Sequence, residues 1–179
     1  MKRTYYLLAL VIIASSITLS CAKKGQNPRE LSEEEARIEA VLQRASFVDM
    51  NGEEVFLADY AGKVVMIDFW ETWCGPCLMV FPAMDSLKKE YGNEFEVLAV
   101  NTLTADERKD VEEFIANNNY DFEYSLDLND VGGEVISLGI PFKVYIDPNG
   151  FLIKAELGSA GTEGDYLKAK TIIEDNKNL

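Results

Sequence analysis

The sequence predicts an α/β protein, in which helices flank a central mixed β-sheet, from three observations. Two nearly unbroken apolar runs, at residues 64–70 and 95–101, are typical of central strands that are covered on both faces. A segment with helical spacing follows each run, as in proteins that alternate strands and helices. The turn sequence Asp147-Pro-Asn-Gly150 then joins two strand-like runs ahead of a last helix. The 179 residues, 47% of them apolar, suffice for one compact domain with a sizeable core.

The first element in chain order is a targeting signal. Lys2 and Arg3 make a basic start, an apolar run covers residues 5–19, and the small residue Ser20 ends it. This pattern predicts a secretory signal peptide over residues 1–20, and the run is too short for a comfortable membrane span.

The end of this segment, residues 17–21, resembles a bacterial lipoprotein signal. The resemblance implies cleavage before Cys21, which is then lipidated and becomes the first residue of the mature chain. Residues 21–32 are expected to form a polar, lipid-anchored tether, and residues 33–179 the domain. Ordinary signal-peptide cleavage nearby and an uncleaved anchor are the alternatives. All three place the domain outside the cytoplasm.

A helix and a hairpin open the domain. Ser32 precedes three glutamates, so a capping side chain and favourable charges mark the start of a helix that runs through Arg44. Two short alternating runs between Phe47 and Leu57 then surround Asn51-Gly52. This dipeptide is the strongest local signal for a hairpin with a type I′ turn.

The remaining elements follow from apolar periodicity and from residues that end it. Gly92 suits the left-handed cap of a helix at residues 77–91, whereas Gly132 and Gly133 weaken a short helix at residues 131–138. The other elements are expected as strands at residues 122–126, 142–146 and 151–157 and as helices at residues 105–117 and 164–176.

Composition excludes several classes of function. The net charge of −14 argues against nucleic acid as a partner, because such binding begins with neutralisation of phosphates by Lys and Arg. The absence of histidine from the sequence excludes Ser-His-Asp and Cys-His catalysis and His-ligated zinc. We expect neither a metal nor a cofactor.

The chemistry is expected at Cys74 and Cys77, a C-x-x-C pair where a strand ends and a helix begins. A thiol at a helix N-terminus faces unpaired N–H groups and the helix dipole, which favour its thiolate, so Cys74 is the predicted nucleophile. Cys77, one turn further on, resolves the mixed disulfide. A structural bridge and half of a zinc site are the alternatives, although the domain has no further Cys or His to complete a zinc site.

The run Trp73-Cys-Gly-Pro-Cys77 after a strand resembles thioredoxin. With the hairpin, residues 60–63 and Gly139-Ile140-Pro141, the chain is similar to the membrane-tethered thioredoxin-like proteins of bacteria, the TlpA and ResA group, over about residues 45–176. The resemblance implies a thioredoxin fold, with a central mixed β-sheet flanked by helices and an added N-terminal hairpin.

Asp68 interrupts the apolar strand that precedes the motif. An unpaired buried carboxylate is costly and tends to have a raised pKa, so such a group is poised for proton transfer. The resemblance implies that Asp68 accepts the proton of the resolving Cys77. The alternative is a carboxylate at a strand end that faces solvent or caps a neighbour.

Pro141 starts a strand, where a proline is awkward unless it occupies an edge or a special conformation. The resemblance implies that Pro141 is cis and faces the cysteines, and that Ile140 pairs through its backbone with the substrate. A trans proline that initiates the strand is the alternative, because cis is the minority form.

Residues beside the cysteines complete the expected site. Trp73, Gly75 and Pro76 are expected to bind the substrate, with Trp73 on the rim around Cys74, and Pro76 also suits a first helical turn. Glu71 is expected to be an exposed loop carboxylate, and a residue that tunes the site is the alternative.

The leading functional hypothesis is reduction of protein disulfides outside the cytoplasm, because Gly75-Pro76 resembles the dipeptide of reducing thioredoxins. Such a reductant implies a membrane electron donor. The resemblance to the ResA group implies apocytochrome c as the typical substrate, and hence a role in cytochrome c maturation. A disulfide-forming oxidase or isomerase is one alternative, and a binding lipoprotein on a thioredoxin scaffold is another. A peroxidase is disfavoured, because the peroxiredoxin pattern has threonine where this chain has Glu71.

Overall fold

The computed structural model describes residues 27–179, so the predicted signal peptide and the predicted lipidation site Cys21 lie outside the described residues. The described α-helices and β-strands are, in chain order, α1 (Glu33–Leu42), β1 (Ser46–Asp49), β2 (Glu54–Phe56), β3 (Val64–Trp70), α2 (Gly75–Tyr91), β4 (Phe95–Asn101), α3 (Arg108–Asn117), β5 (Glu123–Leu126), α4 (Val131–Val135), β6 (Phe142–Ile146), β7 (Leu152–Leu157) and α5 (Gly161–Asn176). Every predicted helix and strand is present, and no boundary differs from its prediction by more than three residues.

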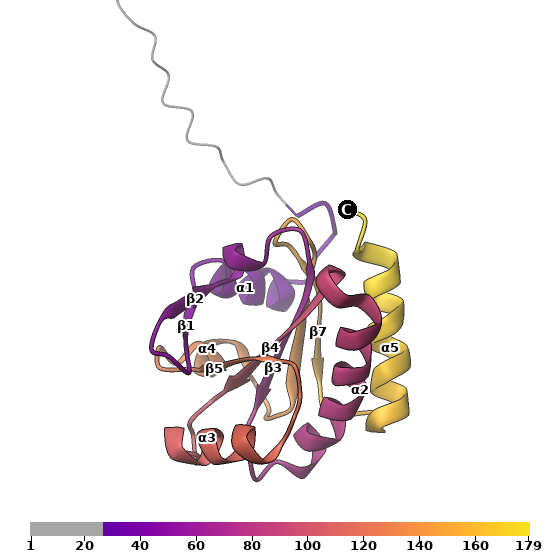
Figure 1. The fold of residues 1–179 in the computed structure, drawn as a ribbon. Helices are drawn as coiled ribbons and strands as arrows, with labels where there is room; N and C mark the ends of the chain where they lie inside the picture. Colours follow the sequence, from indigo (N-terminus) through magenta and orange to yellow (C-terminus); the bar gives the residue numbers. More distant parts are fainter. Residues whose placement is uncertain (1–26) are drawn as a thin grey trace, which may run out of the picture.

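The strands form one mixed seven-stranded sheet in the order β2-β1-β5-β4-β3-β6-β7 (Figure 1). Strands β3, β4 and β5 are parallel, and antiparallel pairs extend the sheet on both sides. The central strands are covered on both faces, which explains why β3 and β4 are apolar runs rather than alternating patterns. The predicted architecture, a mixed sheet flanked by helices with an added N-terminal hairpin, is confirmed.

Helices cover both faces of the sheet and enclose two apolar cores. Helices α2, α3 and α5 pack on one face, and α1 and α4 pack on the other (Figure 1). Side chains alternate along a strand, so Met66 and Trp70 of β3 lie in the first core and Ile67 and Phe69 in the second. The same alternation places Asp68 on the face covered by α2 and α5, which is also the side that carries the cysteines.

The opening hairpin contains a different turn from the predicted type I′. That turn requires positive φ at both central residues, but here Gly52 has a φ of 92° and Asn51 is not among the described residues with positive φ. The N–H of Gly52 donates to the carbonyl of Asp49, and the N–H of Asp49 donates to the carbonyl of Glu53, at 3.1 and 2.9 Å. This is the three-residue loop of a type I turn closed by a left-handed glycine. The Asp49 carboxylate accepts the N–H groups of Asn51 and Glu53 and so stabilises it.

The start of the described chain, which the tether prediction includes, is bound to the domain. Asn27 donates to the carbonyl of Leu152 at 2.9 Å. Arg29 donates to the side chains of Asp147 and Asn176, at 2.7 Å in each case. Contacts with the domain therefore begin earlier in the chain than predicted. Local polar composition indicated a tether because these partners lie more than a hundred residues away.

Candidate active site

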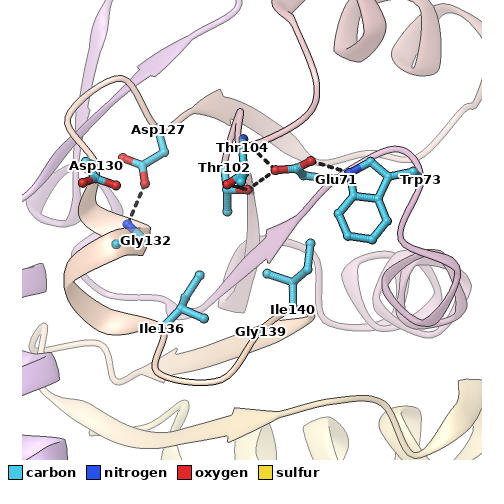
Figure 2. A pocket seen from close by; sticks show the side chains of 11 residues that line it. Glu71, Trp73, Thr102, Thr104, Asp127, Asp130, Gly132, Ile136, Gly139 and Ile140 are labelled. Carbon is cyan, nitrogen blue, oxygen red and sulfur yellow. Dashed lines mark hydrogen bonds between the residues drawn. The ribbon is translucent and has the colours of Figure 1, made fainter.

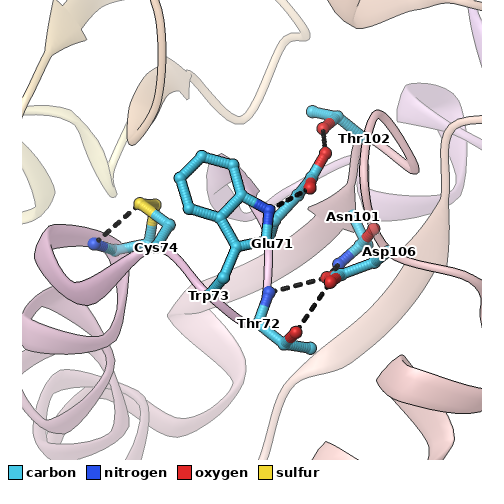
Figure 3. Close-up of a disulfide and its surroundings, with 8 residues drawn as sticks. Glu71, Thr72, Trp73, Cys74, Asn101, Thr102 and Asp106 are labelled. Carbon is cyan, nitrogen blue, oxygen red and sulfur yellow. Dashed lines mark hydrogen bonds between the residues drawn. A yellow bond between two sulfur atoms is a disulfide. The ribbon is translucent and has the colours of Figure 1, made fainter.

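Cys74 precedes α2 and Cys77 lies in its first turn, and the two form a disulfide, with 5.2 Å between their Cα atoms (Figure 3). Cys74 is the N-cap of α2, and its Sγ accepts the N–H of Cys77 at 3.3 Å. Cys74 is 3% exposed, whereas Cys77 is fully buried. A helix N-terminus stabilises negative charge on Sγ, and of this pair only Cys74 reaches the surface. The geometry therefore fits attack by Cys74.

Glu71 braces the loop that precedes the cysteines, and the prediction that it is an exposed carboxylate is wrong. The residue is fully buried, and its side chain accepts hydrogen bonds from the indole N–H of Trp73 and the hydroxyl of Thr102 (Figure 2). The backbone N–H groups of Thr104 and Ala105 also donate to it, at 2.7 and 3.0 Å. Burial raises the pKa of Glu71, but these donors outweigh it and hold the pKa below its usual value. Three of the four donors lie 31 or more residues away in sequence, beyond any local pattern.

A second carboxylate ties the same two loops together. Asp106 accepts both the backbone N–H and the hydroxyl of Thr72, at 2.6 and 2.7 Å, and the side-chain amide of Asn101 donates to it at 2.7 Å (Figure 3). Hydrogen bonds to charged groups are stronger than neutral ones. The residues immediately before Cys74 are therefore fixed to the end of β4 by Glu71 and Asp106 together.

Asp68 is fully buried, and neither of its carboxylate oxygens has a hydrogen-bond partner within residues 27–179. The alternative of a carboxylate that faces solvent or caps a neighbour is therefore excluded. Burial raises the pKa of Asp68 to about 8, while Lys143 acts to lower it and Asp165 to raise it. The pKa of this carboxyl is therefore much closer to neutral pH than that of an ordinary aspartate, and the residue lies on the same face of the sheet as the buried Cys77.

Two charged residues of this region were not predicted. Lys143 of β6 is directly opposite Asp68 in the sheet and is 1% exposed. Its Nζ lies 2.6 Å from the carboxylate of Asp165 on α5. Lys143 interrupts an apolar strand in the same way as Asp68 does, so the same signal could have identified it.

A cavity of about 460 Å³ opens beside the loop that precedes the cysteines (Figure 2). Trp73 and Ile140 are part of its lining, and Trp73 is 63% exposed. The peptide bond between Ile140 and Pro141 is cis, so the trans alternative is not adopted. The structure thus brings Trp73 and Ile140 to one cavity, whereas Gly75 and Pro76 form the first turn of α2 and are not part of the cavity lining.

Within residues 27–179, no group of three or more Cys, Asp or Glu side chains is arranged to hold a metal ion. No helix in that part of the chain is both long and apolar enough to cross a membrane. The groups suited to chemistry at the site are the two sulfur atoms and the carboxyl of Asp68. This set fits sulfur exchange coupled to proton transfer.

Comparisons with known proteins agree with this geometry. The chain matches the AhpC/TSA family over residues 38–178. It is 33% identical over 147 residues to the thiol-disulfide oxidoreductase ResA of Bacillus thuringiensis, which covers 76% of this chain and 82% of ResA. It is 31% identical over 115 residues to the thioredoxin-like protein YneN of Bacillus subtilis, which covers 64% of this chain and 68% of YneN.

A solved structure shares the fold. It is a Chlorobium tepidum protein described as a thiol:disulfide interchange protein of the DsbE kind, with a TM-score of 0.62 and 29% identity. The match covers 72% of this chain and 90% of that one. The predicted thioredoxin-like fold is confirmed.

Proposed function

This chain belongs to the AhpC/TSA family, as a thiol-disulfide oxidoreductase of the TlpA and ResA kind, and we propose that it reduces disulfides of proteins outside the cytoplasm. The observation that carries the proposal is the N–H of Cys77, which donates to Sγ of Cys74 at the start of α2. In the dithiol form this N–H group stabilises a thiolate on Cys74. A thiolate is the nucleophile that disulfide exchange requires.

The reaction starts from the dithiol. The Cys74 thiolate attacks one sulfur of a substrate disulfide, the substrate S–S bond breaks, and the departing substrate sulfur takes a proton from solvent. Cys77 then loses its proton and attacks Sγ of Cys74, so the mixed disulfide breaks and the second substrate sulfur leaves as a thiolate, which takes a proton from solvent. The Cys74–Cys77 disulfide of the structure is the product, and two electrons have passed to the substrate.

Asp68 is proposed to accept the proton of Cys77. Cys77 is fully buried, so its proton needs an acceptor inside the protein. Proton transfer is efficient between groups of similar pKa, and the pKa of Asp68, raised to about 8 by burial, approaches the ~8.5 of an ordinary thiol. A carboxylate with an unshifted pKa would be too weak a base for this step.

The substrate is proposed to lie along Trp73 and Ile140. Both residues line the cavity beside the loop that precedes the cysteines, and Trp73 presents a large exposed ring there. Ile140 is proposed to pair with the substrate through its backbone, beside the cis Pro141. Gly75 and Pro76 contribute through the first turn of α2 rather than through the cavity.

The location and the partners rest on the sequence and on the relatives. The pattern of residues 1–21 supports export and lipidation at Cys21, with the domain held at a membrane outside the cytoplasm. A reductant in that compartment must be recharged, so a membrane electron donor is part of the proposal. Similarity to ResA supports a substrate such as apocytochrome c.

Two measurements test the function. Equilibration of the protein in dithiothreitol or glutathione buffers should give a reduction potential near that of thioredoxin, about −270 mV. A value near the ~ −120 mV of a strong periplasmic oxidant would instead support a disulfide-forming oxidase. The Cys77→Ser variant should accumulate mixed disulfides with natural partners on non-reducing gels, and Cys74→Ser, as its matched control, should not. If neither variant traps partners and the parent does not reduce insulin, the protein is a binding scaffold.

The proposed anchor has its own test. Mass spectrometry of the mature N-terminal peptide should find a lipid on Cys21, and Cys21→Ser should release or mislocalise the protein. An unmodified Cys21 at the mature terminus, or cleavage elsewhere, contradicts the lipid anchor.

A further inference from the structure

Three charged residues form a row across the sheet, on the face that α2 and α5 cover. Asp68 of β3 is directly opposite Lys143 of β6, and Lys143 is directly opposite Glu156 of β7. Directly opposite residues of antiparallel strands point to the same face of a sheet. The charge row, Asp68-Lys143-Glu156, therefore lies on the face of α2 and α5, and α5 adds Asp165 to it.

The contacts within this group are unequal. Lys143 is 1% exposed, and its Nζ lies 2.6 Å from Asp165 and 3.8 Å from Glu156. Asp165 is fully buried and also accepts the hydroxyl of Ser159 at 2.5 Å. Asp68, by contrast, has no hydrogen-bond donor within the described part of the chain.

Acidic groups outnumber basic ones in this group. Three acidic side chains surround the single buried ammonium group of Lys143. Lys154, which is about half exposed, forms an ion pair with Glu156 at the edge of the sheet, with 2.5 Å between Nζ and the carboxylate. A buried carboxylate without a partner retains its proton, because ionisation in a site of low polarity is costly. Asp68 is the carboxyl in this position. The positive charge of Lys143 favours its ionisation, and the negative charge of Asp165 opposes it.

We propose that Lys143 and Asp165 are positioning residues that act as an opposed pair, which sets the pH at which Asp68 releases its proton and hence the pH at which Cys77 resolves the mixed disulfide. This inference rests on the proposed role of Asp68 as proton acceptor for Cys77. It adds that Asp165 holds the ammonium group of Lys143 and thereby keeps Asp68 a base of suitable strength.

The other groups that face Asp68 do not replace this pair. On the same face, β4 contributes the apolar Val97 and Ala99, and α2 contributes Cys77. Tyr145 of β6 is buried, and burial raises its pKa well above its usual value, so it remains neutral. Glu156 lies beyond Lys143, next to the exposed Lys154.

Removal of each charge of the pair should shift the pH at which Asp68 ionises, in opposite directions. Lys143→Gln removes the positive charge, so Asp68 should ionise at a higher pH. Asp165→Asn removes the negative charge and also frees the ammonium group to approach Asp68, so Asp68 should ionise at a lower pH. Each shift should be about one pH unit or more, the size typical of a nearby buried charge. A purely structural role would not move the two variants in opposite directions.

Two readouts separate this inference from the function on which it rests. The first is carboxyl NMR titration of Asp68 in the whole reduced protein, with the signal assigned by its loss in Asp68→Asn. The second is the pH profile of peptide disulfide reduction across the neutral and alkaline range. Opposite shifts in both readouts support the proposal. Shifts in the same direction, or none in the titration, overturn it.

Control variants cover the remaining outcomes. Lys154→Gln removes an exposed positive charge from the edge of the row and should leave both readouts unchanged. Should Asp165→Asn fail to fold, Lys143→Gln alone still decides the proposal, because a parent-like titration of Asp68 in that variant overturns it. A parent-like pH profile in Asp68→Asn, together with opposite shifts in the titration, would reject the proton role of Asp68 while retaining the opposed pair.

Discussion

Asp68 and Glu71 are two fully buried carboxyl groups, three residues apart, with opposite behaviour. Burial is the largest influence on the pKa of each, and in each it acts to raise the pKa. Four donors surround Glu71 and hold its pKa below the usual value, whereas Asp68 has no donor among the described residues and its pKa rises to about 8. Burial sets the penalty for a charge, and the hydrogen bonds decide whether that charge persists.

The two sites therefore do different work. Glu71 remains charged and holds Trp73 and the loop after β4 in place. Asp68 has a raised pKa and is proposed to accept the proton of Cys77. Two buried carboxyl groups near the end of one strand can thus have different roles. The one with hydrogen-bond donors stays charged and holds a loop in place, and the one without them titrates.

The largest expected effect is a gain of stability in Asp68→Asn. The pKa of Asp68 is raised in the folded state, so the unfolded chain releases this proton first, and stability falls as pH rises from about 4 to about 8. The variant lacks this loss and should be more stable at pH 7 by about 4 kcal/mol, an upper estimate from the pKa difference. Urea unfolding of the oxidised protein as a function of pH measures it. A parent-like slope in the variant would contradict the assignment of the titration to Asp68.

Glu71→Gln should lower the stability of the protein, and by less than Asp68→Asn raises it. The amide group must turn its NH₂ toward N–H or O–H donors, so the variant should lose about 2–3 kcal/mol. Because the pKa of Glu71 is lowered in the folded state, its contribution is present above the unfolded value of 4.5 and is lost as pH falls through the folded value. The difference between variant and parent should therefore shrink at acid pH. A difference that is constant with pH would exclude a charged brace.

Trp73→Phe tests a single donor of the brace. The ring is largely exposed, so the main loss is the indole N–H to Glu71, and the variant should be destabilised by about 1 kcal/mol. In the Glu71→Gln background the same change should cost less, because the charged acceptor is already gone. Equal costs in the two backgrounds would show that Trp73 contributes through packing instead.

The smallest expected effect is a departure from additivity between Asp68→Asn and Glu71→Gln. Three residues of strand separate the sites by roughly 10 Å, and changes at that distance without shared partners add to within about 0.5 kcal/mol. The double variant in the same urea series measures the coupling. A larger coupling would mean that one network serves both carboxyls.

The sequence predicted what depends on local pattern and nearby spacing. It located every described α-helix and β-strand and the cysteine pair. It also located the buried Asp68, because a charge inside an apolar run is visible without a structure. It missed the burial of Glu71, because three of the four donors to this carboxylate follow β4, another strand. It also missed the turn at Asn51, where the Asp49 carboxylate stabilises a type I turn over the type I′ turn that Asn-Gly favours.

The contacts of Asn27 and Arg29 fix the start of the described chain to one end of the sheet. Arg29 binds Asp147, which follows the end of β6 that pairs with the start of β3, and Asn27 binds the first residue of β7. The disulfide follows the other end of β3. A load applied through the chain before residue 27 is therefore borne by the end of the sheet far from the cysteines. The disulfide lies at the opposite end of β3, so such a load would not act directly on the cysteines.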